Sequence, residues 1–471
     1  MGWFSRGTGF KEIARVLSFL ILSFWSASEG HARFSSRFSL SVGEEYNDNI
    51  FFSKRKEHDF VTTITPTLSF FYTLPVELTP VFTLNLAPSG QIFARHSDLN
   101  NFGFDQNFTA STGYTYRYSP RLSFHLSDSL SQLGSTRTTG VAGQDVLQGV
   151  RTPTTLPPQG GIDPRPLSQR SGDLISSGKT LTNLFSLQGT YLYAPDITFT
   201  GGYSTVFATF LDEGGRDVSH SIGVRGVYNW RQAHNIHAGY TMSIISARNG
   251  DDSVVHNFDV GDDYFSTYTI RLTPTLTVAA STGIGFNAGS SGPRVVNNTN
   301  ITVQQLWERA TLAAGVQKGL TASYGISGPS DTTSFFTSFI IRLTERLTGT
   351  AGVDYSLFDT DDVNFNTFQT HAGLQYWMTS WLSSNLRYSY RWIDSGAGAT
   401  STDLLERGKV SGNSVNLTFT AHFDLWPNFG LSRGITSPYL TPVITRQVPP
   451  PVVTPSPFPP PFVTPTPSPS P

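Results

Sequence analysis

The sequence contains no cysteine, and this absence excludes several kinds of site. Without a thiol we expect no disulfide, no thiolate metal site, no cysteine nucleophile and no lipidated cysteine. Charged residues are also scarce, at 14% of 471 residues, and they nearly balance to a net charge of −2. A chain with so little net charge has no broad basic field, so nucleic acid is not an expected partner.

Long hydrophobic runs are missing as well. After the first 32 residues no apolar run reaches the roughly 18 residues of a spanning helix, so we expect no helical anchor there. Residues 1–32 have another layout: Arg6, Lys11 and Arg15 flank or precede the apolar stretch Val16–Trp25, and Gly30-His31-Ala32 offers small residues for cleavage. This layout is typical of a secretory signal peptide, so we expect an exported protein.

The sequence has alternation instead. In Leu347–Leu357 the odd-numbered residues are apolar or small, and the even-numbered residues are hydrophilic or glycine. Successive side chains of a strand point to opposite faces, so this pattern predicts a strand with one apolar face. The mean hydropathy of −0.17 fits this pattern, because alternating apolar and polar residues average to near neutral. Similar strands recur along most of the chain.

The connections between these strands alternate between two kinds. Short ones recur at residues 118–122, 193–197, 272–276, 343–347 and 378–382, and longer polar ones lie between them. Tight turns at one end and long loops at the other are typical of an antiparallel up-and-down β-barrel of the bacterial outer membrane. We therefore predict an all-β transmembrane barrel over residues 33–426. Its short turns would face the periplasm.

The alternation predicts about eighteen strands. Sixteen is the alternative if Pro80–Arg95, interrupted by Pro88-Ser89-Gly90, or Asn298–Trp307 is not a strand. Either number leaves a water-filled lumen. Pro66 falls within the strand Phe60–Tyr72 and lacks an N–H for the ladder, so it predicts a bulge or a locally unpaired position.

Two segments stand apart from the strands. Residues 134–178, rich in Gly, Pro, Thr, Ser and Gln, predict a long extracellular loop, either folded into the pore or exposed and flexible. Residues 427–471 are proline-rich and favour polyproline II rather than a sheet. We expect a disordered periplasmic tail there; a spacer or a ligand for a periplasmic partner are the alternatives.

One family resemblance lies in the first predicted hairpin. Glu45-Tyr46-Asn47-Asp48-Asn49-Ile50-Phe51, a charged loop, and then Asp59-Phe60-Val61 through Pro66 resemble the start of a family of outer-membrane β-barrel porins. Some members of that family accompany exopolysaccharide or exosortase loci. The resemblance implies a barrel in the outer membrane, with polymer export as one family role.

Catalytic and cofactor motifs are absent from the sequence. It contains no His-Glu-x-x-His, no nucleophile elbow and no glycine-rich phosphate loop, so we predict no enzyme activity, no cofactor and no metal site. Acidic pairs such as Asp251-Asp252 could bind divalent cations, or could be ordinary solvated loop residues. Aromatic residues near strand ends, Tyr376 and Trp377 among them, predict an interfacial belt on the lipid-facing side.

The lumen-facing charges suggest a selectivity hypothesis. Arg117, Arg271 and Arg342 each precede a short turn on the polar face, and a lipid-facing arginine would cost about 2–4 kcal/mol at the midplane. We expect a cationic ring that favours anions, unless these arginines pair with acids across the wall. The full set of predicted pore-lining residues is Arg117, Arg225, Arg271, Arg342, Arg387 and Arg391 toward the periplasm, with Asp105, Asp259 and Asp354 toward the exterior.

Taken together, these features predict a passive pore for small hydrophilic solutes. A barrel for exopolysaccharide export, or a structural or adhesive surface barrel, remain the alternatives. The expected partners are outer-membrane lipid, the barrel-assembly machinery that reads a terminal aromatic strand, and the solute or exported polysaccharide. The sequence leaves a homo-oligomer open.

Overall fold

The computed structural model describes residues 33–73, 81–101, 107–133, 179–211, 214–230, 234–246, 252–266, 275–289, 292–322, 329–359, 364–395, 408–426 and 430–431. The predicted signal peptide, the loop 134–178 and most of the proline-rich tail lie outside these ranges. In the described part, no helix is long and apolar enough to cross a bilayer.

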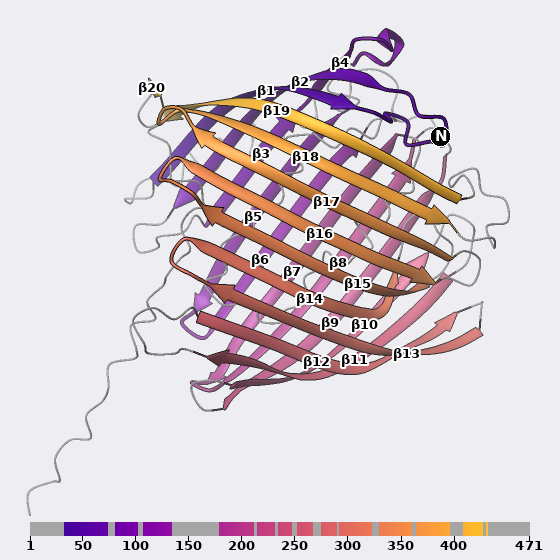
Figure 1. The fold of residues 1–471 in the computed structure, drawn as a ribbon. Coiled ribbons are helices and arrows are strands. Elements are labelled where there is room, and N and C mark those ends of the chain that lie inside the picture. The colour runs from indigo at the N-terminus through magenta and orange to yellow at the C-terminus, as the bar shows by residue number, and fades with distance from the viewer. Residues whose placement is uncertain are drawn as a thin grey trace, which may run out of the picture.

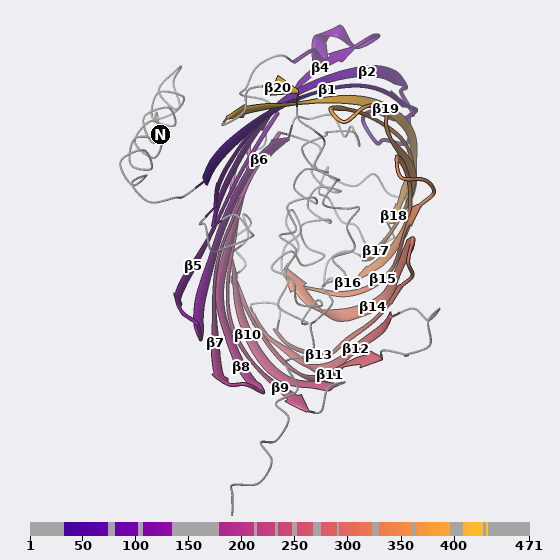
Figure 2. The ribbon, with the colours of Figure 1, turned by 90° about the vertical axis from the view of Figure 1, so that its left-hand side faces the viewer.

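The described residues form one antiparallel sheet that closes on itself (Figures 1 and 2). Its first strand, β1, pairs with β2 on one side and with β19 on the other, so the sheet is a barrel. The strands are β1 Arg33–Asn47, β2 Asp59–Thr73, β3 Phe82–Pro88, β4 Gly90–Phe93, β5 Phe108–Ser119, β6 Leu122–Leu133, β7 Thr180–Ala194, β8 Ile197–Phe210, β9 Arg216–Trp230, β10 His234–Ser246, β11 Asp252–Ser266, β12 Thr275–Gly289, β13 Gly292–Leu306, β14 Ala310–Ala322, β15 Pro329–Arg342, β16 Leu347–Asp359, β17 Asn364–Trp377, β18 Leu382–Ser395, β19 Gly408–Trp426 and β20 Gly430–Leu431.

The barrel wall has eighteen strand positions, as the sequence predicts. β3 and β4 occupy a single position, because both pair with β2 and only Ser89 separates them. The two-residue β20 pairs only with the end of β19, within the segment expected to be an unstructured tail. The alternative of sixteen strands is therefore wrong.

Pro66 lies at the break between β3 and β4. β3 pairs with Leu68 through Tyr72 and β4 pairs with Val61 through Ile64, so the residues around Pro66 have no ladder partner on that side. The pairing of β2 with β1 continues through Pro66 without a register shift. The expected unpaired position is thus confirmed, and the prolyl ring removes no ladder hydrogen bond there.

Three of the short turns share one stabilising contact. Ser119 Oγ accepts hydrogen bonds from the N–H groups of Arg121 and Leu122 at 3.3 and 3.1 Å. Thr344 and Thr379 do the same in the β15–β16 and β17–β18 turns. A hydroxyl that caps the following N–H groups fixes a tight reversal. The other end carries longer links, although β12 and β13 are only two residues apart there.

The two faces of the wall differ as the alternation predicts. Large apolar side chains stand exposed on the outside, for example Val224 and Ile284, each 58% exposed. The inner face carries small and polar residues, including hydroxyl pairs between neighbouring strands such as Ser221–Ser243. A closed barrel with an apolar outer face satisfies its backbone within a bilayer. This is the architecture of bacterial outer-membrane proteins, and the chain is a transmembrane β-barrel.

Candidate functional site

The inner wall and the seam between β19, β1 and β2 hold the candidate functional residues. Two predicted arginines lie at the short-turn end. Arg342 is the last residue of β15, and Arg117 precedes a register shift near the end of β5. Arg225 lies nearer to the short-turn end of β9 than to its loop end, and its side chain is buried. Arg271, which follows β11 and precedes β12 in the sequence, lies outside the described residues.

The two arginines of β18 do not lie at the short-turn end. Arg387 stands midway along the strand, opposite Gly373 of β17. Arg391 lies closer to the loop end, and its guanidinium sits 4.0 Å from the ring centroid of Phe52. The expectation that Arg391 lies toward the short-turn end is therefore wrong. Phase along a strand gives the face of a side chain, but the depth depends on where the strand begins.

The predicted acids are spread along the wall. Asp354 lies nearer the loop end of β16, whereas Asp259 lies midway along β11 with its carboxylate 3.8 Å from His237 Nε2. Asp105 falls outside the described residues. An acidic belt at the exterior end is thus not visible in these positions.

Two inner-face features near the short-turn end escaped the sequence analysis. Arg37 of β1 donates from Nε to Asp424 of β19 at 3.1 Å, which pairs one lumenal cation across the seam. Trp377 stacks on His422 with ring centroids 5.6 Å apart. Because its neighbour Tyr376 is the residue exposed outside, Trp377 faces inward and is not part of the lipid-facing belt. Alternation is the signal that could have found it, because Tyr376 and Trp377 are consecutive in one strand and must face opposite sides.

The residues that carry the family resemblance form a hydrogen-bonded contact, here called a fastening, between the β1–β2 loop and β19 at the loop end of the seam. Asp48 accepts hydrogen bonds from the backbone and side-chain nitrogens of Asn413 in β19, at 2.5 and 2.9 Å. Asn49 donates to the carbonyls of Ser53 and Ser411. These contacts hold the β1–β2 loop against the last strand. The motif therefore has a structural role at the closure of the barrel.

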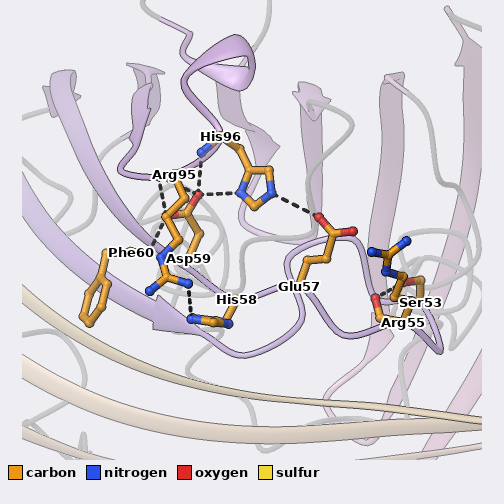
Figure 3. Close-up of polar contacts among 8 residues, drawn as sticks. All are labelled: Ser53, Arg55, Glu57, His58, Asp59, Phe60, Arg95 and His96. Atoms are coloured by element: carbon orange, nitrogen blue, oxygen red, sulfur yellow. Dashed lines mark hydrogen bonds and ion pairs between the residues drawn. The ribbon is translucent and has the colours of Figure 1, made fainter.

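A second fastening joins this loop to the segment after β4 (Figure 3). Asp59 has no exposed surface, and its carboxylate accepts hydrogen bonds from the N–H groups of Phe60, Arg95 and His96. His96 contacts two acids, with Nδ1 at 2.8 Å from Asp59 and Nε2 at 3.1 Å from Glu57. One imidazole thus links both carboxylates across two loops.

These loop groups have shifted acidities. Burial alone would raise the pKa of Asp59, but hydrogen bonds from the His96 side chain and from three backbone N–H groups outweigh it and lower that pKa. The hydrogen bond to Asp59 raises the pKa of His96, with a further contribution from Glu57, although burial opposes it. The shifts favour a charged His96 between two carboxylates.

An apolar cluster underlies the same loops. Ile50, Val61 and Phe93 are almost fully buried together, and Leu99 packs against them. Phe52 adopts a positive φ of 49°, which is uncommon for a side-chain-bearing residue and turns its ring toward Arg391. In the described part of the chain, no group of three or more His, Asp or Glu side chains is placed to hold a metal ion.

Comparisons with known proteins give no family assignment. No family model and no curated protein sequence matches the chain. Among solved structures, OccK2 (OpdF) of Pseudomonas aeruginosa has a TM-score of 0.44 and 10% identity, covering 84% of this chain and 98% of that one. OpdK of the same organism, solved with vanillate, has a TM-score of 0.43 and 10% identity over 83% and 98%. OccAB3 of Acinetobacter baumannii has 0.41 and 10% over 83% and 99%. Similarity at this level carries no function over to this chain.

Proposed function

We propose that the protein is an outer-membrane channel for the passive passage of small hydrophilic solutes. The observation that carries the proposal is the closed wall of eighteen strand positions with a polar inner face. Barrels of sixteen to eighteen strands are wide enough to enclose an aqueous channel. The serine pairs Ser334–Ser356 and Ser389–Ser414 and the ion pair Arg37–Asp424 are the kind of groups that suit a wetted wall.

Conductance across a planar bilayer tests this proposal. The purified full-length protein should give a steady open conductance without any added partner. A barrel that stays closed until export partners are added would favour polymer export, and a barrel that never conducts would favour a structural or adhesive role. Either of these results would overturn the channel proposal.

A mild preference for anions is part of the proposal. Arg117 and Arg342, together with Arg271, would form a cationic ring near the short turns. The pair Arg37–Asp424 reduces the net charge at that end, and salt screens a wide pore over about 8 Å at physiological strength. We therefore expect a modest shift of reversal potential in a KCl gradient. Cation preference, or an unchanged potential in the triple Arg→Ala variant, would contradict it.

The remaining expectations concern topology and partners. We propose that the strand ends joined by long loops face the exterior, that residues 134–178 lie outside the cell, and that residues 427–471 extend into the periplasm, where a partner could bind them. Protease added to intact cells should cut within 134–178 and spare the tail.

We further propose that β19, rather than the chain end, is the strand read by the assembly machinery. Deleting residues 437–471 should then leave membrane insertion intact. A homo-oligomer is a further proposal that cross-linking in the membrane would test.

A further inference from the structure

Two loop-joined hairpins carry the same arrangement on the outer face of the barrel. In β8–β9, the guanidinium of Arg216 lies 4.7 Å from the ring centroid of Phe207. Four residues further into the barrel on each strand, the hydroxyl of Tyr203 is 2.9 Å from Nδ1 of His220. The ring of His220 also meets Phe207 edge-on at 6.1 Å and stacks on Tyr203 at 6.2 Å. We name these four residues the β8–β9 site.

The hairpin β18–β19 repeats this pattern. Lys409 Nζ lies 4.9 Å from the ring centroid of Trp392, and the hydroxyl of Tyr388 donates to Asn413 Oδ1 at 2.8 Å. The tyrosine again precedes the ring by four residues, and its partner again follows the cation by four. The registers agree as well. In each ladder, the residue whose ring lies under the cation (Phe207 or Trp392) pairs with the residue two positions after that cation. These four residues form the β18–β19 site.

A third hairpin shows which part of the arrangement is special. In β10–β11, Tyr240 and His256 form the same kind of hydrogen bond at 2.8 Å. The positions that correspond to the ring and the cation are occupied by Ile244 and Asp252. The tyrosine pair alone is thus a feature of the wall, whereas the cation on an aromatic ring is confined, among these three hairpins, to the two sites.

Both sites lie where the apolar outer face meets the loops. Below the β8–β9 site, Ile222 and Val224 are 51% and 58% exposed, as residues that face lipid acyl chains would be. Arg216 is itself exposed and is the first residue of β9 after the loop. Aromatic rings and cations at this height lie at the level of lipid headgroups. A cation held on a ring face keeps its charge turned outward with little loss of side-chain freedom on binding.

The two sites differ in their neighbouring acids. Asp217 follows Arg216 but is buried, because alternation turns it to the inner face. At the β18–β19 site, Asp394 lies opposite Lys409 in the ladder, and Asp48 is bonded to Asn413. Among the described residues, the β8–β9 site therefore presents the less compensated positive charge.

We propose that the β8–β9 site binds the phosphate of an anionic lipid headgroup in the leaflet on the long-loop side. Arg216 provides the charge, and His220 provides a hydrogen bond from Nε2 when its Nδ1 accepts from the Tyr203 hydroxyl. The acyl chains lie along the exposed apolar residues below. The β18–β19 site binds the same headgroup more weakly. This assignment depends on the transmembrane fold and is independent of whether the barrel conducts.

Native mass spectrometry of the full chain in detergent micelles tests the proposal, with phosphatidylglycerol as the anionic probe and phosphatidylcholine as the zwitterionic one. The unmodified protein should retain phosphatidylglycerol at a several-fold lower concentration than phosphatidylcholine. Arg216→Ala should remove most of that preference, and Lys409→Ala should reduce it less. Arg346→Ala, which removes an exposed arginine in the short β15–β16 turn, is the matched control and should leave it unchanged.

Each other outcome counts against the proposal. Equal retention of the two lipids by the unmodified protein, or an unchanged preference in Arg216→Ala, would overturn it. Inorganic phosphate added at the same concentrations separates a headgroup from a free ion, and displacement of the lipid by phosphate alone would overturn the assignment to lipid. Heat-modified mobility on electrophoresis shows that each variant has folded, and His220→Gln, which keeps a hydrogen-bonding side chain, should show an intermediate preference.

Discussion

The seam, formed by β19, β1, β2 and the loop between β1 and β2, and the far wall from β6 to β13 are built from the same strand ladder but stabilised by different contacts. At the loop end of the seam, partly or fully buried polar side chains bind backbone groups of other segments, as the partly buried Asp48 binds the N–H of Asn413, 365 residues away in the chain. Along the far wall, hydroxyl pairs such as Ser221–Ser243 join strands that adjoin in sequence. Bringing the two ends of a long chain together costs loop-closure entropy, so the closing contact needs stronger fastening than a hairpin does.

The largest expected difference between the two regions comes from removing one carboxylate in each. Asp59→Ala removes a buried carboxylate that accepts from three backbone N–H groups and pairs with His96, so the free energy of unfolding should fall by about 3–5 kcal/mol. Asp259→Ala on the far wall removes a partly exposed carboxylate that lies 3.8 Å from His237 Nε2, and should cost about 1 kcal/mol or less. Urea unfolding in lipid vesicles, followed by tryptophan fluorescence, measures both. Equal losses would remove the distinction between seam and wall.

The contact between Phe52 and Arg391 should come next. Truncating the buried ring by Phe52→Ala removes packing and the cation contact together, whereas Arg391→Ala removes the cation. A double-mutant cycle isolates the interaction, which we expect to couple by about 1–2 kcal/mol because the pair is largely desolvated. The exposed pair Arg216 and Phe207 offers the matched cycle on the outer face and should couple by about 0.5–1 kcal/mol. A larger coupling outside than at the seam would contradict this ranking.

The seam should also respond to pH. The pKa of His96 is raised in the folded state, so its contribution is fully present below the ordinary value of 6.5 and is lost as pH rises through the raised value. The pKa of Asp59 is lowered, so its contribution is present above 3.8 and is lost as pH falls through the lowered value. Both contributions are fully present between pH 3.8 and 6.5, so the stability of the seam should be greatest there.

Unfolding midpoints across this pH range test the dependence. His96→Gln should flatten the loss on the alkaline side, and His58→Gln in the same loop is the control that should not. Neutral His96 still donates to Asp59 but no longer pairs favourably with Glu57, so partial loosening of the β1–β2 loop is expected rather than unfolding. A stability that keeps rising above pH 7 would show that His96 does not fasten these loops.

The sequence predicts the wall better than the fastenings. Alternation and turn spacing identify the barrel, its strand number and its two faces, since these depend on local periodicity. The break at Ser89 and the unpaired Pro66 were also readable, because proline and glycine have local rules. The pairing of Arg37 with Asp424 was not, because it depends on which distant strands become neighbours. The inward face of Trp377 was readable from its alternation with Tyr376, but its contact with His422 was not. The depth of Arg391 was readable too, because the short turn predicted at residues 378–382 puts the later residues of that strand at the loop end. Its contact with Phe52 was not, because that loop residue is far away in the sequence.

The smallest effect compares the same chemical pair in both regions. Ser389 and Ser414 form a buried hydroxyl pair at 2.8 Å beside the seam, and Ser127 and Ser186 form a partly buried pair at 2.8 Å on the wall. Ser389→Ala removes one hydrogen-bond partner of the buried Ser414 hydroxyl and should lower the free energy of unfolding by about 1 kcal/mol. The same change at Ser127 should cost about half as much, because lumenal water can replace the lost hydrogen bond. Urea midpoints of the two variants, measured with equal slopes, give the ratio. A larger loss at Ser127 would mean that fastening does not concentrate where the two ends of the sheet meet.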